Sequence, residues 1–183
     1  MRTPLALILA AGLGTAGSAL AQPAPAEEAV FVMHKVDAQG VGERIGEIKA
    51  LDTPDGLVLQ PNLHGLPPGA HGFHVHENAD CRPEKKDGQS VAAGMAGNHY
   101  DPQNTGKHLG PSGSGHKGDL PVLRVDSDGV ADEPLTVPRL TVKEIRDRAL
   151  VIHAGGDNYS DEPQPLGGGG ARIACGVLEK TQT

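Results

Sequence analysis

One stretch of the chain, His71–Asp119, constrains the fold more than any other. It contains six of the nine histidines and ends at an aspartate. Histidine is the commonest metal ligand among protein side chains, and a metal ion needs several ligands at one point in space. The chain must therefore fold so that these dispersed residues converge. The six are His71, His74, His76, His99, His108 and His116.

The segment His74-Val75-His76 has the apolar surroundings of a β-strand. Side chains two positions apart on a strand point to the same face, so one metal ion can contact both imidazoles. A pair of this kind on its own could also be two surface histidines. Three imidazoles and one carboxylate would complete a tetrahedral zinc shell with no open water position, which predicts a zinc ion that orders the loop. Four further candidate ligands follow in sequence rich in Gly and Pro: His99, His108, His116 and Asp119.

The first 21 residues predict export. Met1–Ala21 combines one positive charge, a short apolar run and small residues that end in Ala19-Leu20-Ala21. This pattern is typical of a secretory signal peptide that is cleaved before Gln22. A membrane anchor is the alternative, but the apolar run is shorter than the roughly 20 residues that span a bilayer. We expect one domain over residues 22–183, with 22–28 flexible and no stable membrane association.

The two cysteines, Cys81 and Cys175, lie far apart in the sequence. An even number of cysteines in an exported chain favours one disulfide. Free thiols and thiolate metal ligands are the alternatives, although no C-x-x-C pair is present. A disulfide over this length of chain would constrain the unfolded state by roughly 4–5 kcal/mol in the entropic model. It would also connect the start of the irregular metal loop to a C-terminal strand.

The composition favours β-structure. Aromatic residues make up 2% of the chain and tryptophan is absent, so the core must be aliphatic, while 26 Gly and 15 Pro mark many turns. Eight short segments with turn signals between them predict an antiparallel sandwich or barrel, with a helix of one or two turns only within Thr141–Arg148. The long insertions 78–119 and 154–170 lack regular patterns, and such loops are usually functional. The predicted strands are Ala29–Val36, Arg44–Leu51, Gly56–Asn62, Ala70–Glu77, Leu120–Asp126, Glu133–Val137, Ala149–His153 and Ala171–Leu178.

Charge narrows the choice of partners. The chain has 16 Lys and Arg against 23 Asp and Glu, a formal net charge of −7, and loss of the first 21 residues would remove one more positive charge. Without a basic cluster, nucleic acid is not an expected partner.

Three residues around the second insertion are further candidates. His153 ends a predicted strand, and a lone histidine there is more often structural than a ligand. Beside the first loop it becomes a candidate ligand, and Asp157 could accept a hydrogen bond from the outer nitrogen of a ligand histidine. A disulfide at Cys175 would draw Arg172 towards the metal loop; otherwise Arg172 is a solvated strand residue.

Together these residues resemble the copper–zinc superoxide dismutases, and more closely their bacterial, exported branch. The resemblance covers essentially all of Glu27–Leu178. The motifs that carry it are His71-Gly-Phe-His-Val-His-Glu-Asn, Asn98-His99-Tyr-Asp-Pro, Gly106-Lys-His108-Leu-Gly-Pro, Gly115-His116-Lys-Gly-Asp119-Leu-Pro, His153-Ala-Gly-Gly-Asp157-Asn-Tyr-Ser-Asp and Gly-Gly-Ala-Arg172-Ile-Ala-Cys175-Gly-Val.

The resemblance implies a role for each of these residues. His99 would be an imidazolate that bridges one copper and one zinc per subunit, and it would act in catalysis together with Arg172, the cation at the substrate channel. Asp157 would link a copper ligand to a zinc ligand, and His71 would be structural. Cys81 and Cys175 would form the family disulfide. The implied copper ligands are His74, His76, His99 and His153, and the implied zinc ligands are His99, His108, His116 and Asp119.

The implied fold is an eight-stranded antiparallel Greek-key barrel or sandwich with a metal-binding loop and an electrostatic-type loop. The implied function is a periplasmic superoxide dismutase, which converts superoxide to dioxygen and hydrogen peroxide by copper redox cycling and so protects against extracytoplasmic superoxide. A homodimer is left open. Two other functions remain as alternatives: a copper or zinc carrier with the same ligands, and a zinc hydrolase with Glu77 as its general base.

Overall fold

Strands and the turns between them account for most of residues 27–179, which are the residues that the computed structural model describes. The predicted signal peptide 1–21 and residues 22–26 lie outside this range. Of the predicted flexible lead-in, Glu28 is already part of a strand and pairs with Leu51. Across 27–179, no helix has both the length and the apolar character needed to cross a membrane.

Seven strands form one antiparallel sheet in the order β5-β10-β11-β1-β2-β3-β9, and β4–β8 and β6–β7 form two smaller pairs. Neighbours such as β5 and β10 are distant in sequence, as the crossing connections of a Greek key require. The fold is therefore the expected all-β type. The strands are β1 Glu28–Asp37, β2 Gly40–Thr53, β3 Gly56–Leu63, β4 Gly69–His71, β5 Phe73–His76, β6 Glu84–Lys86, β7 Gln89–Val91, β8 Leu123–Val125, β9 Leu135–Val137, β10 Ala149–His153 and β11 Arg172–Leu178.

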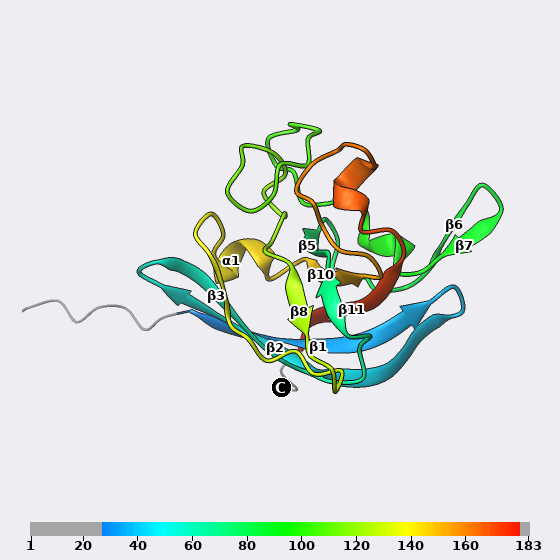
Figure 1. The fold of residues 1–183 in the computed structure, drawn as a ribbon, viewed down its shortest axis with the longest axis horizontal. Coiled ribbons are helices and arrows are strands. Elements are labelled where there is room, and N and C mark those ends of the chain that lie inside the picture. The colour runs from blue at the N-terminus through cyan, green and yellow to red at the C-terminus, as the bar shows by residue number, and fades with distance from the viewer. Residues whose placement is uncertain (1–26, 180–183) are drawn as a thin grey trace, which may run out of the picture.

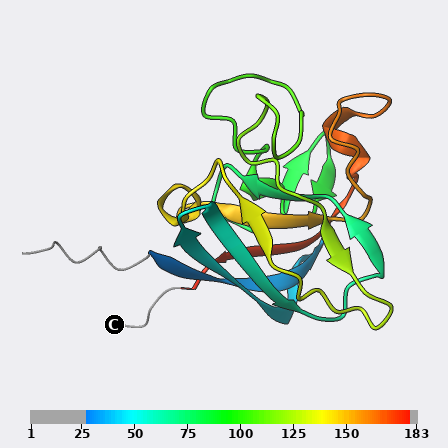
Figure 2. The same ribbon diagram turned by 60° about the vertical axis from the view of Figure 1, so that its left-hand side comes forward.

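The large sheet curls around an aliphatic core, and the two long loops lie together at one end of it (Figures 1 and 2). Strand β3 shows how the core forms, because its buried residues alternate with more exposed ones. Leu57 and Leu59 point inward and are fully buried. The apolar run Leu57-Val58-Leu59 thus follows the two-residue period of a strand that is covered on one face. Phe31 and Phe73, the only phenylalanines, are also fully buried.

The predicted strand Ala70–Glu77 is interrupted at Gly72, which separates β4 from β5. Gly72 donates its N–H to the carbonyl of Gly155 at 2.8 Å and accepts the N–H of His153 at 2.8 Å. A Cβ at this position would lie 3.3 Å from the carbonyl oxygen of Gly156. The strand breaks because its backbone turns to hydrogen-bond with the 154–170 loop, and β4 pairs with β8 instead.

The insertion 78–119 is less irregular than predicted, because it contains the hairpin β6–β7 and the short 3-10 helix η1, Gly94–Ala96. Asp87 and Gly88 connect the two strands with φ angles of 52° and 81°. A two-residue turn with positive φ at both positions is the preferred hairpin connection, and Asp-Gly is one of its sequence signatures. The sequence did contain this signal. The second insertion likewise contains a 3-10 helix, η2, Pro165–Gly168.

The helical prediction at Thr141–Arg148 is confirmed only as a short helix, α1, Val142–Ile145. Thr141 and Glu144 form a capping box at its start. The N–H of Val142 donates to the carboxylate of Asp52 on β2 at 2.8 Å. Other predicted strands differ in length: β8 keeps only the second half of Leu120–Asp126, β9 begins at Leu135 and not at Glu133, and β2 extends beyond Arg44–Leu51 at both ends.

Candidate metal centre

Two adjacent strands supply three of the predicted ligands. His74 and His76 lie on β5, and their partners across the ladder with β10 are Val151 and Ala149. The alternation of β5 places both histidines on the face opposite Phe73, which belongs to the core. His153 is the last residue of β10.

The remaining predicted ligands reach the same place because two loop segments run along β5. His99 pairs with His76, and Asp119 pairs with His74, as isolated antiparallel bridges. The backbone of Val75 bonds to both segments: its N–H donates to Gly118 at 2.9 Å, and its carbonyl accepts from Tyr100 at 2.8 Å. The loop is therefore attached to an edge strand that already carries two histidines.

Four imidazoles converge at the end of β5 and β10. Each offers one ring nitrogen, and these nitrogens lie within 4.8 Å of one another. The rings of His74 and His99 are stacked with their centroids 3.9 Å apart, and the centroid of His153 lies 4.9 Å from that of His74. All four residues are buried; they are His74, His76, His99 and His153.

Hydrogen bonds leave one nitrogen of each ring free at the centre of this group. The outer nitrogens have partners: His76 Nδ1 lies 3.0 Å from the carbonyl of Gly97, and His153 Nδ1 lies 3.0 Å from that of Gly170. A carbonyl can only accept, so each outer nitrogen is the N–H and the inner nitrogen carries the lone pair. Within residues 27–179 the inner nitrogens have no hydrogen-bond partner; they are His74 Nδ1, His76 Nε2, His99 Nε2 and His153 Nε2.

Asp119 is the centre of a second group. Its Oδ1 lies 3.1 Å from His99 Nδ1, 3.0 Å from His108 Nδ1 and 3.4 Å from His116 Nδ1. The Asp119 side chain is fully buried, and His108 and His116 are buried as well. Within the described residues, His108 Nδ1 and His116 Nδ1 form no hydrogen bond of good geometry. A tighter geometric grouping around Asp119 contains His74 in place of His116.

Asp157 lies between the two groups and contacts one ring of each. Its Oδ2 lies 2.8 Å from His74 Nε2, and its Oδ1 lies 2.7 Å from His108 Nε2. The side chain is fully buried. The backbone N–H of Tyr159 also donates to Oδ1, at 2.8 Å. One carboxylate therefore orients a ring from the strand and a ring from the loop.

The surroundings of these rings shift their pKa values in opposite directions. Burial lowers the pKa of His74 and His76 well below the usual range and that of His153 to about 4. Burial alone would also lower the pKa of His108, but the carboxylates of Asp119 and Asp157 beside its two ring nitrogens outweigh it and raise this pKa to about 9. Burial would raise the pKa of Asp119, yet the nearby rings of His108 and His99 hold it far below the usual value.

Arg172 lies beside the four-histidine group. Its guanidinium donates to the carbonyls of Ala93 and Gly97, both at 2.6 Å, and burial lowers its pKa. The carbonyl of Gly97 thus accepts from both Arg172 and His76. The disulfide Cys81–Cys175, with Cα atoms 5.7 Å apart, connects the first loop to the same strand, β11. The prediction that the disulfide brings Arg172 to the metal loop agrees with this arrangement.

His71 is buried and lies outside both groups. Its Nδ1 lies 2.7 Å from the carbonyl of His153, and its Nε2 lies 2.8 Å from that of Pro67. Both nitrogens are engaged with backbone, which agrees with the structural role expected for it.

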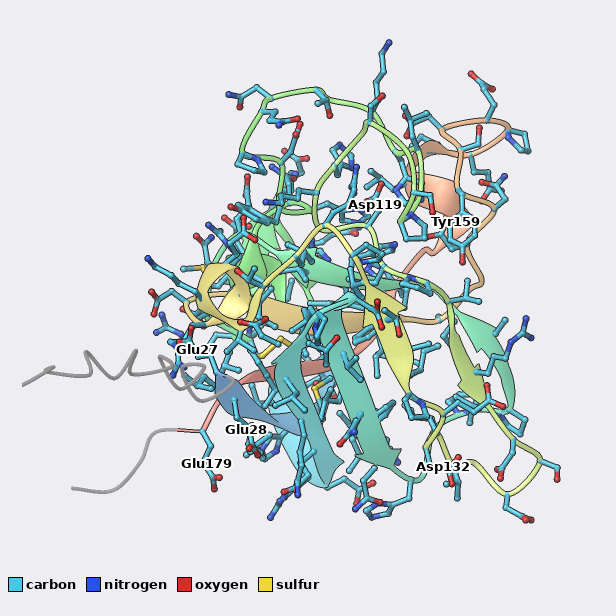
Figure 3. All side chains as sticks on the ribbon, turned by 90° about the vertical axis from the view of Figure 1, so that its left-hand side faces the viewer. Glu27, Glu28, Asp119, Asp132, Tyr159 and Glu179 are labelled. Carbon is cyan, nitrogen blue, oxygen red and sulfur yellow. A yellow bond between two sulfur atoms is a disulfide. The ribbon has the colours of Figure 1, made fainter. Side chains whose placement is uncertain are left out.

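Sequence reasoning missed several residues that hold the loops. Asp161 accepts the backbone N–H of His108 at 2.9 Å, and the Tyr159 hydroxyl accepts that of Val122 at 3.0 Å. No pattern signals contacts between backbone groups and side chains that are distant in sequence. Figure 3 shows Asp119 and Tyr159 at the same end of the barrel, and Asp132 at the other end.

A surface pocket of about 400 Å³ gives access to the loop histidines. His99 and His116 contribute to its wall, and Leu166 of the second loop contributes as well. The pocket is also lined by Glu77, Asn98, Asp101, Asn104 and Gly106.

Residues 45–178 match the family model described as copper/zinc superoxide dismutase. The chain belongs to this family. It is therefore an oxidoreductase that converts superoxide to dioxygen and hydrogen peroxide, with copper and zinc as its cofactors. The two histidine-rich groups are what such cofactors require, since imidazole suits both metals.

Curated relatives and solved structures agree with this assignment. The chain is 60% identical over 148 residues to Cu-Zn superoxide dismutase 2 of Salmonella typhimurium, which covers 80% of this chain and 86% of the relative. The structure of the Cu/Zn superoxide dismutase from Brucella abortus superposes with a TM-score of 0.82 at 51% identity, over 84% of this chain and all of that one. The solution structure of the monomeric copper, zinc enzyme from Salmonella enterica gives 0.76 at 58% identity, with the same coverage.

Proposed function

We propose that His74, His76, His99 and His153 bind the copper ion of this superoxide dismutase, and that His99, His108, His116 and Asp119 bind the zinc ion. The observation that carries this proposal is the set of buried ring nitrogens without a partner. An unpaired buried polar atom is costly, and six such atoms facing two points are explained by two metal ions. His99 belongs to both sets, with Nε2 directed to one and Nδ1 to the other.

His116, and not His74, is the proposed fourth zinc ligand. His74 has one nitrogen engaged with Asp157 and the other in the four-histidine group, so neither remains for a second metal. His116 Nδ1 is buried, lies 3.4 Å from Asp119 Oδ1 and lacks a partner within residues 27–179. The zinc set then has the three imidazoles and one carboxylate of a closed tetrahedral site.

Each residue of the site has a defined task in catalysis. When bound, copper would supply the one-electron redox chemistry, and zinc would supply a fixed positive charge. His99 takes up a proton at Nε2 in one half of the cycle and gives it to the peroxide in the other, and water supplies the second proton of hydrogen peroxide. Its Nδ1 side remains held beside Asp119, so the ring returns to the same position. Arg172 attracts the superoxide anion, and Asp157 orients His74 and His108.

The two alternative functions fit the site less well. A metal carrier needs an exposed site that exchanges its ion, whereas these ligands are at most 8% exposed. A zinc hydrolase needs an open water position and a general base. Glu77, the candidate base, accepts the backbone N–H of Asn98 at 2.8 Å and so holds the segment before His99.

We also propose that the protein is exported to the periplasm after cleavage before Gln22, without stable membrane association. The signal-peptide pattern of residues 1–21 supports this, as does the Cys81–Cys175 disulfide, which an oxidising compartment favours. All proposed ligands come from one chain, so a monomer is sufficient for activity. Intact mass of the exported protein and its sedimentation would test the cleavage site and the alternative of a homodimer.

The decay rate of superoxide, measured by pulse radiolysis with the purified protein loaded with copper and zinc, tests the assignment of the ligands. We expect a near diffusion-limited second-order rate on the order of 10⁸–10⁹ M⁻¹s⁻¹, a range for which superoxide dismutase is itself a standard example. The variant His153→Gln should lose copper and activity but keep zinc, and His116→Gln should lose zinc and keep copper. Unchanged metal content in either variant would show that the assignment of that ligand is wrong.

A further inference from the structure

The proposed zinc ligands His108 and His116 lie at the two ends of a turn, residues 107–116, that contains neither strand nor helix. The turn is closed by the N–H of His116, which donates to the carbonyl of Lys107 at 2.8 Å. Its backbone folds so closely on itself that a Cβ at Gly113 would lie 2.2 Å from the carbonyl oxygen of Leu109. Because the turn has no strand or helix to hold it, contacts with groups outside it matter for where the two rings point.

The second loop, residues 154–170, holds the His108 end of the turn. Asp157 engages its ring and Asp161 accepts its backbone N–H at 2.9 Å. The His116 end has no equivalent contact with the second loop among the hydrogen bonds of the described residues. Its ring is also the one farthest from Asp119 Oδ1, at 3.4 Å against 3.0 Å for His108.

Arg139 holds the His116 end from the barrel. It lies between β9 and α1, and its guanidinium donates to the carbonyl of Gly113 through Nη1 and to that of His116 through Nη2, the latter at 2.8 Å. Within residues 27–179, Arg139 is the one side chain of the barrel that donates to carbonyls of this turn. Next to it, Lys117 forms an ion pair with Glu144 of α1.

We propose that Arg139 is a positioning residue for zinc, which fixes His116 by holding the backbone carbonyl of this ligand. This inference rests on the proposed zinc set. Arginine suits the task because its planar guanidinium is always charged and holds several donors in a rigid fork. The two carbonyls belong to residues three apart in the turn, so the fork sets the orientation of the segment that carries His116. A lysine ammonium has no such fork and fixes this orientation less well.

The test compares zinc binding by Arg139→Gln, Arg139→Lys and a control, Arg124→Gln, all in the protein expressed from the full-length chain. Arg124 is exposed on β8 and forms no side-chain hydrogen bond or ion pair within the described residues. Competition with a chromophoric chelator gives the zinc dissociation constant. Loss of a group that orients a ligand typically weakens metal binding roughly 10- to 100-fold, and we expect a change of this size for Arg139→Gln. Arg139→Lys should lie between this variant and the wild type, and Arg124→Gln should equal the wild type.

Two further readouts separate positioning from general stability. The first is the visible absorption spectrum of Co²⁺ bound in place of zinc, which should change in Arg139→Gln because the ligand geometry changes. The second is the rise in unfolding temperature on zinc addition, which mass action links to affinity. This rise should shrink in Arg139→Gln. The copper affinity should remain that of the wild type.

Equal zinc affinity and an equal Co²⁺ spectrum in Arg139→Gln and the wild type would overturn the inference, even if the zinc-free variant were less stable. If Arg139→Gln does not fold, Arg139→Lys decides alone, and a zinc affinity equal to the wild type would again overturn it. Failure of the proposed zinc set is distinguishable, because the zinc affinity of His116→Gln would then equal that of the wild type.

Discussion

At the scale of single residues, the carboxylate of Asp157 is the side chain that contacts both the four-histidine group and the group around Asp119. It accepts from a ring on β5 and from a ring in the first loop, and it is fully buried. His74 is also held by the ladder of its strand, whereas His108 belongs to a loop without regular structure. The loop residue therefore depends more on Asp157 than the strand residue does.

We expect Asp157→Asn to weaken zinc binding roughly 10- to 100-fold, the effect typical of a lost partner of a metal ligand. His74 and His108 contact different oxygens of Asp157, and an amide has only one oxygen, so one of the two rings would face a donating N–H₂ group. Chelator competition measures the zinc dissociation constant. The matched control is Asp128→Asn, since Asp128 is exposed in a turn at the other side of β8. Equal zinc affinity in Asp157→Asn and the wild type would contradict the role assigned to this carboxylate.

The pKa shifts of the buried histidines predict how the stability of the metal-free protein depends on pH. Burial depresses the pKa of His74, His76 and His153 when folded, so below about pH 6.5 the unfolded chain binds more protons. Each such proton lowers stability by about 1.4 kcal/mol per pH unit. His108 acts in the opposite sense: its raised pKa contributes stability that is fully present below pH 6.5 and is lost as the pH rises through about 9. Burial lowers the pKa of His99 as well. Below pH 6.5 His108 is protonated in both states, so the depressed histidines alone set the slope there.

Stability of the metal-free protein should therefore fall as the pH is lowered from 6.5 towards the pKa of His153, about 4. Urea unfolding across this range measures the slope. His153→Gln should reduce the slope, and His64→Gln, at an exposed position, should leave it unchanged. A stability that is constant over this range would show that these rings are not held neutral by burial.

At the scale of elements, much of the site could be predicted because its proposed ligands follow local rules. The two-residue period of β5 places His74 and His76 on one face, and the last residue of β10 and the loop before β8 carry the remaining proposed ligands. The interruption at Gly72 was not predictable from periodicity, since its cause is a hydrogen bond with the distant residue Gly155. Arg139 and Asp161 were missed for the same reason: each holds backbone groups that lie more than 20 residues away.

The disulfide joins two elements that no strand pairing connects. Cys81 precedes β6 and Cys175 lies on β11, 94 residues away. Reduction should lower the free energy of unfolding of the metal-free protein by about 4–5 kcal/mol if the entropic model applies. Urea unfolding with and without a thiol reductant measures the difference. In the double variant Cys81→Ala/Cys175→Ala the reductant should have no effect, and a similarly small effect in the wild type would mean that the disulfide adds little to stability.

At the scale of the whole molecule, charge and substrate have the same sign. The chain has a formal net charge of −7, and superoxide is an anion. Exposed charges are screened over a Debye length of about 8 Å at physiological ionic strength. The field near the four-histidine group therefore governs the approach of the substrate more than the distant acidic residues do. Arg172, the first residue of β11, is half-buried beside this group.

We expect Arg172→Ala to lower the rate constant for superoxide roughly tenfold at low ionic strength, within the range that electrostatic steering contributes. The dependence of the rate on salt should weaken at the same time.

Arg172 also donates to the carbonyls of Ala93 and Gly97, so a loss of rate alone could come from a displaced loop. Arg172→Lys separates the two effects, because it keeps the charge but not the rigid fork. If steering is the role of Arg172, the lysine variant retains the salt dependence of the wild type and the alanine variant does not. A salt dependence that is equal in all three proteins would show that substrate attraction arises elsewhere, and that Arg172 acts through the Gly97 carbonyl that it shares with His76.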